Sequence, residues 1–393
     1  MNETHNSRQV LLSYGFRPFF LLAALWSAGA MGVWLWILHS GALLPSRFDP
    51  MSWHIHEMLF GFVMAAIAGF LLTAVANWTS RPPIAGAELA LLVIAWVAGR
   101  LACWFSALLP EWLVMFLDLV LPALLAAIVA REVMAAKNWR NLPMVVPLIV
   151  LGFANLLMHL ESFGTAIPVG LGWRLAIAAV IVLVSAVGGR IVPAFTRNWL
   201  KKSGGGEVPG HGLVDRLSLG LLHLGLMLWA FLPQSALTGY LLVAAAAANA
   251  WRLLRWRGYD VREELLLLVL HVGYCWLIVG VALLGLSILW QDVPLTAAIH
   301  ALTAGTVGTM VLAVMTRATR GHTGRPLTAD RATIAIYALV FTAGVSRVAA
   351  GFDVWNPTML NISALLWMGA YGAFVLVYGP MLARPRAPII AGS

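Results

Sequence analysis

Histidine is the residue type in this chain best placed for chemistry, because several of its ten copies fall inside long apolar segments. His54 and His56 open one such segment, within Trp53-His54-Ile55-His56-Glu57, and His300 lies near the start of another. Neutral imidazole binds haem iron and copper well, and a carboxylate often orients its second ring nitrogen. We therefore predict a cofactor and metal site at His54, His56 and His300, with Glu57, one helical turn from His54, as the orienting carboxylate.

The spacing of these histidines restricts how they share a site. His54 and His56 are separated by about 200° around a helix, so both cannot face one site unless the helix starts between them. We expect one to ligate iron and the other to contact copper, a haem propionate or the outside water. Near His300, small residues would let a flat macrocycle or another helix approach closely. These are Ala301, Ala304, Gly305 and Gly308.

Other histidines suggest further ligands. His271 lies nearer the cytoplasmic end of its segment and His322 in the loop Gly321-His322-Thr323-Gly324-Arg325; with Arg317 nearby, they predict a second metal or ligand site. His159 and His223 are weaker candidates, because a single histidine in a membrane segment is more often a hydrogen-bonded packing residue than a ligand.

Charged side chains within apolar segments cost about 2.5–3.5 kcal/mol each to insert and are therefore expected to be paired or functional. Arg100 and Asp118 lie at similar depths in two segments joined by a short hairpin at Pro110, which favours a structural ion pair; a role facing a cofactor is the alternative. Arg100 and Arg347 are also candidates to bind haem propionates. The two cysteines, Cys103 and Cys275, lie in apolar segments and predict neither a disulfide nor a Cys-x-x-Cys metal site.

Composition sets the class of protein that must position these residues. Hydrophobic residues make up 61% of the chain, charged residues 10%, and mean hydropathy is +0.87, whereas soluble proteins carry roughly 25% charged residues. Apolar runs of about 20 residues span a bilayer, and only helices satisfy their backbone groups without a closed barrel. We predict an all-α integral membrane protein, a single polytopic domain over residues 1–393 with about twelve transmembrane helices. The predicted spans are 18–40, 54–78, 87–108, 112–134, 143–162, 172–195, 215–232, 236–254, 264–290, 294–316, 331–351 and 359–382.

The net charge of +9 is explained by topology and not by nucleic acid binding. With both termini in the cytoplasm, all but four of the 25 Lys and Arg residues fall at cytoplasmic ends or loops, as the positive-inside rule requires. The four exceptions are Arg47, Arg100, Arg174 and Arg347. The chain is therefore predicted to be a multi-pass membrane protein whose surroundings are lipid, with no nucleic acid partner.

A short pattern recurs at the ends of the second, sixth and tenth spans. It reads Gly69-x4-Ala74-Val75, Gly189-x4-Ala194-Phe195 and Gly308-x4-Ala313-Val314, at offsets of 120 and 119 residues. Chance in a chain rich in Ala, Gly and Val is one explanation. The other is three arcs of four helices related by pseudo-threefold symmetry.

Several segments together resemble the NnrS family of bacterial membrane proteins. They are Gly15-Phe16-Arg17-Pro18-Phe19-Phe20, Trp53 to Gly61, Gly188-Gly189-Arg190-Ile191-Val192-Pro193, His271-Val272-Gly273-Tyr274, His300-Ala301-Leu302-Thr303, Met315-Thr316-Arg317 and Gly321-His322-Thr323-Gly324-Arg325. The resemblance extends over nearly the whole chain. It implies a haem- and copper-containing protein of the bacterial inner membrane, linked to nitric oxide and denitrification, without a settled reaction. His223 lies outside these motifs.

A second, weaker resemblance is to the core of haem–copper oxidases and nitric oxide reductases. That fold implies twelve spans, three four-helix arcs, and haem ligands near the outer ends of its second and tenth spans, where His54, His56 and His300 fall here. The sequence departs from that fold because the sixth span has no histidine and no adjacent His-His pair occurs in the seventh or eighth. The usual three-histidine copper site cannot be carried over.

The resulting hypothesis is a haem protein, with b-type haem and with copper as a further candidate, that binds nitric oxide or reduces it as an oxidoreductase. Quinol or another electron donor would then be needed, although no quinone site or attached redox domain is readable. A secondary transporter exporting a nitrosylated or metal complex is the rival from another class. A non-catalytic haem-based sensor of nitric oxide is the third possibility.

Overall fold

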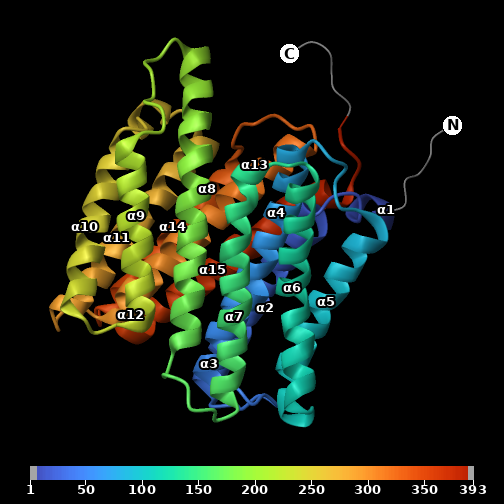
Figure 1. Cartoon of the computed structure of the whole chain (residues 1–393), viewed down its shortest axis with the longest axis vertical. Coiled ribbons are helices and arrows are strands. Elements are labelled where there is room, and N and C mark those ends of the chain that lie inside the picture. Colours follow the sequence, from blue (N-terminus) through green and yellow to red (C-terminus); the bar gives the residue numbers. More distant parts are fainter. Residues whose placement is uncertain (1–6, 388–393) are drawn as a thin grey trace. The chain divides into compact units, whose positions relative to one another are not determined.

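The chain folds as helices throughout the part that its structure, a computed structural model, describes, which is residues 7–387 (Figure 1). Within that range, 12 helices are long and apolar enough to cross a membrane, and no strand is present. The prediction of an all-α, twelve-span integral membrane protein is therefore confirmed. The spans are α2 (Phe16–Ser40), α3–η1–α4 (Pro50–Thr79), α5 (Gly86–Trp104), α6 (Glu111–Ala135), η3–α7 (Trp139–Ser162), α8 (Leu171–Ser203), α9 (Leu213–Phe231), α10 (Ala236–Leu254), α11 (Leu265–Leu289), α12–η5–α13 (Leu295–His322), α14 (Arg331–Gly351) and α15 (Asn356–Ala383).

Most predicted span boundaries agree with the structure to within a few residues, and the following differences concern the C-terminal ends of three spans. α5 stops at Trp104, and a separate 3-10 turn, η2 (Ser106–Leu108), follows it. α8 continues through Pro193 to Ser203, and its last turn carries Lys201 and Lys202, whose charges complement the helix dipole. α13 (Gly308–His322) also runs past the predicted end, so His322 is the last residue of a helix and not part of a loop.

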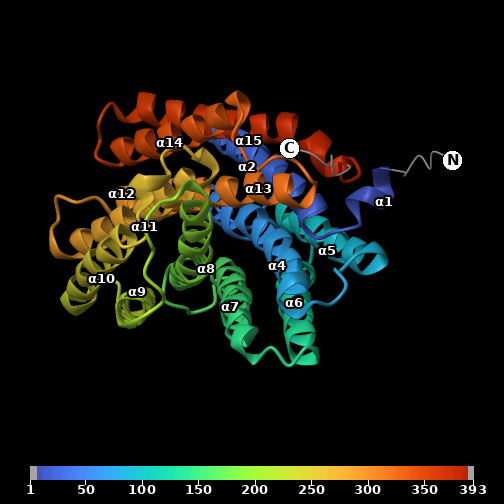
Figure 2. The ribbon, with the colours of Figure 1, turned by 90° about the horizontal axis from the view of Figure 1, so that it is seen from above.

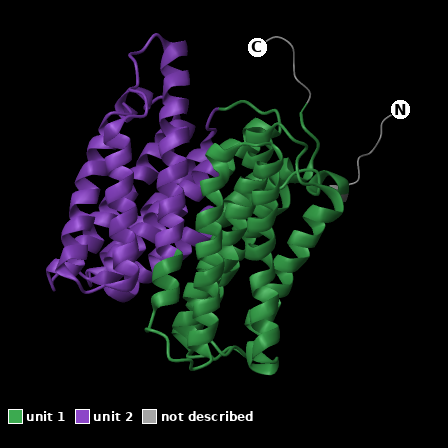
Figure 3. Cartoon of the chain, in the orientation of Figure 1, with its two compact units in different colours: residues 1–176, 315–327, 371–393 green, residues 177–314, 328–370 purple. Residues whose placement is uncertain are grey.

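The described residues form two compact units (Figure 3). Unit 1 comprises residues 1–176, 315–327 and 371–393, and unit 2 comprises residues 177–314 and 328–370. Three helices, α8, α13 and α15, begin in one unit and end in the other. The single-domain description, the three arcs and the cytoplasmic placement of the termini stay predictions, and residues 1–6 and 388–393 lie outside the described range.

Each unit is built from sequence neighbours that pack as antiparallel helices. In unit 1, α5 packs against α6, α6 against α7, and α2 against α4 (Met64–Thr79). In unit 2, α10 packs against both α9 and α11, and Figure 2 shows these three helices side by side. Short connections such as the one at Pro110 produce this pairing, since they leave consecutive helices no room to separate.

Two spans contain a π-helical stretch, and each stretch begins directly after a histidine. η1 (Glu57–Val63) follows His56, the last residue of α3 (Pro50–His56), and η5 (Ala301–Val307) follows His300, the last residue of α12 (Leu295–His300). A π-helix has a wider turn than an α-helix, is rare, and is frequently found at functional sites. Both histidines are thus held where the backbone changes its winding.

The two spans share several residues at matching positions. Each shared residue in the span of His300 lies 244 positions (300 − 56) after its counterpart in the span of His56. The same offset separates the two π-helical stretches, and it separates Ser80 from Gly324, which both have a left-handed backbone conformation. The shared residues are Pro50 and Pro294, Ile55 and Ile299, His56 and His300, Gly61 and Gly305, Val63 and Val307, and Arg81-Pro82 and Arg325-Pro326.

A tryptophan packs against the glycine of each π-helix. A Cβ atom added at Gly61 would lie 2.3 Å from Nε1 of Trp26 on α2, and one added at Gly305 would lie 2.6 Å from Cδ2 of Trp276 on α11. Trp26 and Trp276 each pack against the glycine of the π-helix in the span that follows, and each requires a glycine there because a larger residue leaves no room for the indole ring.

This close approach yields a test. Gly61→Ala places a methyl group against Trp26 and the Glu57 carboxylate, 3.0 Å away, so we expect the variant to lose about 1–3 kcal/mol of stability by overpacking. Gly29→Ala is the matched control in α2, because nothing lies within 4 Å of its Cβ position, and alanine favours a helix by up to about 1 kcal/mol. Thermal unfolding of the purified variants in detergent measures both effects. Equal melting temperatures for the two variants would contradict the tight Gly61–Trp26 packing.

Candidate metal centre

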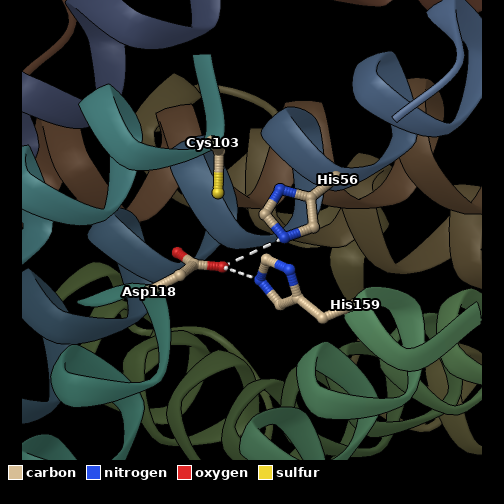
Figure 4. A group of neighbouring side chains, drawn as sticks. All are labelled: His56, Cys103, Asp118 and His159. Atoms are coloured by element: carbon tan, nitrogen blue, oxygen red, sulfur yellow. Dashed lines mark hydrogen bonds and ion pairs between the residues drawn. The ribbon is translucent and has the colours of Figure 1, made fainter. Parts of the chain in front are cut away.

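Four side chains that could ligate a metal meet inside unit 1 (Figure 4). They are His56, Cys103, Asp118 and His159, all buried, and one ligand atom from each lies within 4.8 Å of the others. Figure 4 shows the Cys103 sulfur and the two imidazole rings directed toward the Asp118 carboxylate. They come from four spans, so the site depends on the packing of α3, α5, α6 and α7 together.

Local structure explains how each span presents its residues. Asp49 caps α3 by accepting hydrogen bonds from the backbone N–H groups of Met51 and Ser52, at 3.0 and 3.1 Å, which fixes where the helix carrying His56 begins. On α5, Arg100 and Cys103 are three residues apart. On α7 (Val145–Ser162), Asn155 and His159 are four apart. Both spacings place side chains on one face of a helix.

Asp118 is the hub of the hydrogen bonds. Its Oδ2 atom accepts from Asn155 Nδ2 at 2.8 Å and lies 3.0 Å from His159 Nε2 and 3.1 Å from His56 Nε2. Its Oδ1 atom forms an ion pair with Arg100. The ion pair between Arg100 and Asp118 that the sequence predicted is therefore present.

Arg100 also joins Asp118 to Glu57. The second terminal nitrogen of its guanidinium group donates to Glu57 Oε1 at 2.7 Å, and the other Glu57 oxygen accepts from Trp26 Nε1 at 2.8 Å. One arginine thus bridges two carboxylates, all three side chains being at most 4% exposed. Gly99 makes this possible, because a Cβ atom there would lie 2.9 Å from Asp118 Oδ1.

Both ring nitrogens of His56 face oxygen acceptors. Nδ1 lies 3.2 Å from Glu57 Oε1, and Nε2 lies 2.9 Å from Asn155 Oδ1 as well as near Asp118. A proton on each nitrogen would make His56 a cation and would balance the two carboxylates together with Arg100. A metal ion could replace the proton on Nε2, because the lone pair of that nitrogen can bind either a proton or a metal ion.

The donor set fits a transition metal. Two imidazoles, a thiol and a carboxylate are ligands of zinc and copper, and thiolate selects these metals over magnesium or calcium. His159 Nδ1 is buried without a hydrogen-bond partner among the described residues, which is rare for a buried polar atom. This buried cluster could therefore hold a metal ion.

Sequence reasoning missed Cys103, a member of this group, and Asn155, which donates a hydrogen bond to Asp118. It set Cys103 aside because no second cysteine lies near it, and it did not consider Asn155. The spacing of Arg100 and Cys103 was an available signal, because a residue three positions from a buried charge shares its helix face. Asn155 had the same relation to His159, one turn further along α7.

Glu57 orients a different histidine from the one expected. The sequence placed it beside His54, but its carboxylate contacts His56, because the winding changes at residue 57 and turns adjacent residues toward one site. His54 and His56 do face different neighbours, as their spacing predicts. The ring of His54 stacks on Trp34 at 4.6 Å, and that of His56 stacks on Phe48 at 4.6 Å.

The remaining predicted residues are distributed over both units. In unit 2, His300 Nδ1 bonds to the Thr296 carbonyl at 2.7 Å, His271 Nδ1 to the Leu267 carbonyl at 3.1 Å, and His223 Nε2 to the Ser185 hydroxyl at 3.0 Å. Arg347 is half-buried on α14 of unit 2.

The two histidines of the predicted second site belong to different units. His322 and Arg317 are on the part of α13 in unit 1, whereas His271 is in unit 2. The second site therefore stays a prediction, as does a site shared by His300 with His54 or His56.

A double-mutant cycle tests the buried ion pair. Arg100→Gln leaves two buried carboxylates uncompensated, and we expect it to cost about 3–5 kcal/mol, with Arg100→Gln/Asp118→Asn costing less than the sum of the single changes. The exposed pair of Arg131 and Glu88, 2.8 Å apart, is the control, where Glu88→Gln is expected to change stability by less than about 1 kcal/mol. Unfolding monitored in detergent gives each value. Additive costs would show that the two buried groups do not depend on each other.

Comparisons with known proteins identify the family. A search of curated proteins gives no match for this chain. The family model described as NnrS protein matches residues 10–386, which is nearly the whole sequence. The chain is a member of the NnrS family.

Proposed function

We propose that this protein is a metal-dependent membrane protein of nitric oxide metabolism or nitrosative-stress protection in the bacterial inner membrane. The observation that carries the proposal is the buried group of His56, Cys103, Asp118 and His159. Membership of the NnrS family supports the connection with nitric oxide.

Copper is the metal that we propose for this group. Cys103 with two imidazoles is a soft, nitrogen- and sulfur-rich set that suits copper, and Asp118 supplies a fourth donor. Glu57 would act from the next layer, because it contacts His56 Nδ1 at 3.2 Å and so keeps Nε2 directed into the site. Arg100 would hold both carboxylates in place.

Haem is proposed at His300, in unit 2. Its Nδ1–H donates to the Thr296 carbonyl, which leaves the lone pair on Nε2, the tautomer that ligates iron. At Gly305, five residues further along the span, Trp276 packs with its Nε1 buried and without a hydrogen-bond partner among the described residues, and Ala301 stands where unit 1 has Glu57. An apolar face with small residues and an unused donor suits a macrocycle. Both ring nitrogens of His56 are already engaged by oxygen acceptors. The proposal of His54 as a haem ligand rests on the sequence alone.

Haem iron or copper would supply reversible binding of nitric oxide and one-electron exchange, whereas the protein's own residues would exclude water and hold the charges. Phe60, Met64, Trp96, Leu121 and Pro122 line narrow gaps beside Arg100, Asp118 and Asn155. These apolar side chains would keep ions out of the site, whereas nitric oxide is small and uncharged. If the bound gas is reduced, quinol or another donor would supply the electrons.

Metal analysis tests the site in unit 1. We expect purified wild-type protein from copper-replete cells to contain copper, and Cys103→Ser or His159→Asn to weaken its binding by at least about tenfold. Cys275→Ser is the matched control, because Cys275 is the other free cysteine and is exposed. Elemental analysis and a competition titration with a chelator measure the effect. Equal copper in the Cys103→Ser and Cys275→Ser variants would exclude Cys103 as a ligand, and wild-type protein without metal would remove the proposal.

Absorption spectroscopy tests the site in unit 2. Wild-type protein from haem-replete cells is expected to show a Soret band that shifts on addition of nitric oxide. His300→Ala is expected to lose or shift that band, while His223→Ala, which alters another histidine of unit 2, keeps it. An unchanged spectrum in His300→Ala would exclude this residue as an iron ligand.

A further inference from the structure

A half-buried histidine lies near the middle of a membrane span in unit 2. His223 comes ten residues after the first residue of α9 and eight before the last (223 − 213 and 231 − 223). At about 1.5 Å per residue, it is about 15 and 12 Å from the two ends of the helix, within a hydrocarbon core roughly 30 Å thick. An ionisable side chain at this depth is costly and is expected to have a functional role.

The contact with Ser185 decides which ring nitrogen of His223 carries the hydrogen. The Ser185 hydroxyl, on α8, donates to the Val182 carbonyl at 2.9 Å, and its oxygen lies 3.0 Å from His223 Nε2. Because a hydroxyl has one hydrogen to donate, the Ser185 oxygen accepts from the Nε2–H group. A charged imidazole is costly at membrane depth, so His223 is neutral and has its lone pair on Nδ1. This ring therefore offers a hydrogen-bond acceptor.

The Nδ1 atom of His223 is accessible from outside the protein. It has no hydrogen-bond partner among residues 7–387, and it is not enclosed by them. Two other histidines of unit 2 differ, because Nδ1 of His271 and Nδ1 of His300 bond to the backbone carbonyl groups four residues before them. His223 thus directs an acceptor outward, whereas those two histidines use the same atom within their own helices.

The surface of α9 beside this ring is apolar and uncovered. A helical side chain leans over the turn that precedes its own Cα atom, and in α9 that turn contains Gly220, three residues before His223. Gly220 is exposed, and a Cβ atom added there would have no atom within 4 Å. Leu224 and Met227, which are 52% and 40% exposed, continue the surface on the other side of His223. A flat apolar molecule could therefore lie against α9 and reach Nδ1.

We infer that His223 binds the head group of a membrane-soluble hydroquinone, whose ring hydroxyl donates a hydrogen bond to Nδ1. The bilayer core contains no water, and phospholipid head groups stay in the interfacial region. A hydroxyl donor at this depth therefore belongs to an apolar molecule dissolved in the membrane. Nitric oxide has no hydrogen to donate. The role of the site rests on the proposed function, because a hydroquinone is a class of electron donor that reduction of nitric oxide would require.

Binding of duroquinol to the full-length purified protein tests the site, with duroquinone, its oxidised form, as the comparison. Duroquinol has two hydroxyl donors, whereas duroquinone has carbonyl acceptors only, so an acceptor on His223 distinguishes the two. His223→Phe removes the acceptor and keeps a flat ring. His39→Phe is the matched control, because His39 is exposed in the last turn of α2. Anaerobic equilibrium dialysis with protein reduced beforehand measures binding without consuming the probe.

We expect wild-type protein and His39→Phe to bind duroquinol roughly fivefold or more tightly than duroquinone, the effect of one hydrogen bond shielded from water. His223→Phe is expected to bind the two forms within about twofold of each other, because it has no acceptor left. Equal binding of the two forms by wild-type protein would overturn the inference, and so would a preference for duroquinol that persists in His223→Phe.

Ser185 is a positioning residue, and the preference between the two forms tests that role. In Ser185→Ala, Nε2 loses its acceptor, so the hydrogen can move to Nδ1, which can then donate to a duroquinone carbonyl. We expect the preference for duroquinol to fall to within about twofold. If Ser185 only packed against His223, both affinities would change together and the preference would stay.

A second pair of variants tests the approach to the ring. Gly220→Leu places a side chain beside His223 and is expected to weaken duroquinol binding roughly tenfold by excluding the probe. Gly29→Leu is the matched control, because Gly29 is also an exposed helical glycine with no atom within 4 Å of its Cβ position. Equal affinities in these two variants would overturn the placement of the head group on α9.

Copper content and the Soret band, measured on the same samples, separate this inference from the proposed function. Loss of the duroquinol preference in His223→Phe, with metal content and the nitric oxide response retained, supports a donor site distinct from the metal sites. Wild-type protein that prefers duroquinol but contains neither copper nor haem would remove the proposed function and leave the binding site supported.

Discussion

The structure of unit 1 depends on the compensation of two carboxylates at membrane depth. Glu57 and Asp118 lie where water cannot reach them, and Arg100 forms an ion pair with each. A charge left alone in hydrocarbon is very costly, so α5, α6 and the span containing η1 cannot separate or rotate without losing this arrangement. The position of His56 follows, because both of its nitrogens are fixed by groups that Arg100 holds in place.

The two histidine spans show how one backbone pattern can support different environments. In unit 1, the residue after His56 is Glu57, which accepts the N–H of Trp26. In unit 2, the corresponding residue is Ala301, and the N–H of Trp276 has no acceptor among the described residues. The first environment is charged and contains several metal donors, whereas the second has an alanine after its histidine and a buried indole N–H. Such a difference suits two cofactors with unlike needs.

Hydropathy was sufficient to predict the spans, because lipid imposes both their length and their apolar composition. Depth and hairpin connectivity were sufficient for the Arg100–Asp118 pair. Spacing placed Cys103 on the helix face of Arg100 and Asn155 on that of His159, but their meeting in one site depends on how four helices are rotated about their axes, which the sequence does not give. The contact of Glu57 with His56 depended on a π-helical turn, which periodicity based on 3.6 residues does not anticipate. The correspondence of the two histidine spans rests on few identities and became clear from their shared geometry.

The widened turn after each histidine also separates the direction of the imidazole from the direction of the helix face that packs against neighbours, which a regular helix would link. In an uninterrupted α-helix, every residue adds about 100° of rotation, so the direction of a side chain at one end determines the direction at the other. A π-helical hydrogen bond spans one more residue than an α-helical one. The rotation between the His56 side chain and the packing surface of α4 therefore differs from that in a regular helix, and the same holds between His300 and α13. Each span can thus aim its imidazole independently of the face with which it contacts its neighbours. Removing a single residue from either stretch would re-aim the histidine while leaving the rest of the span in register.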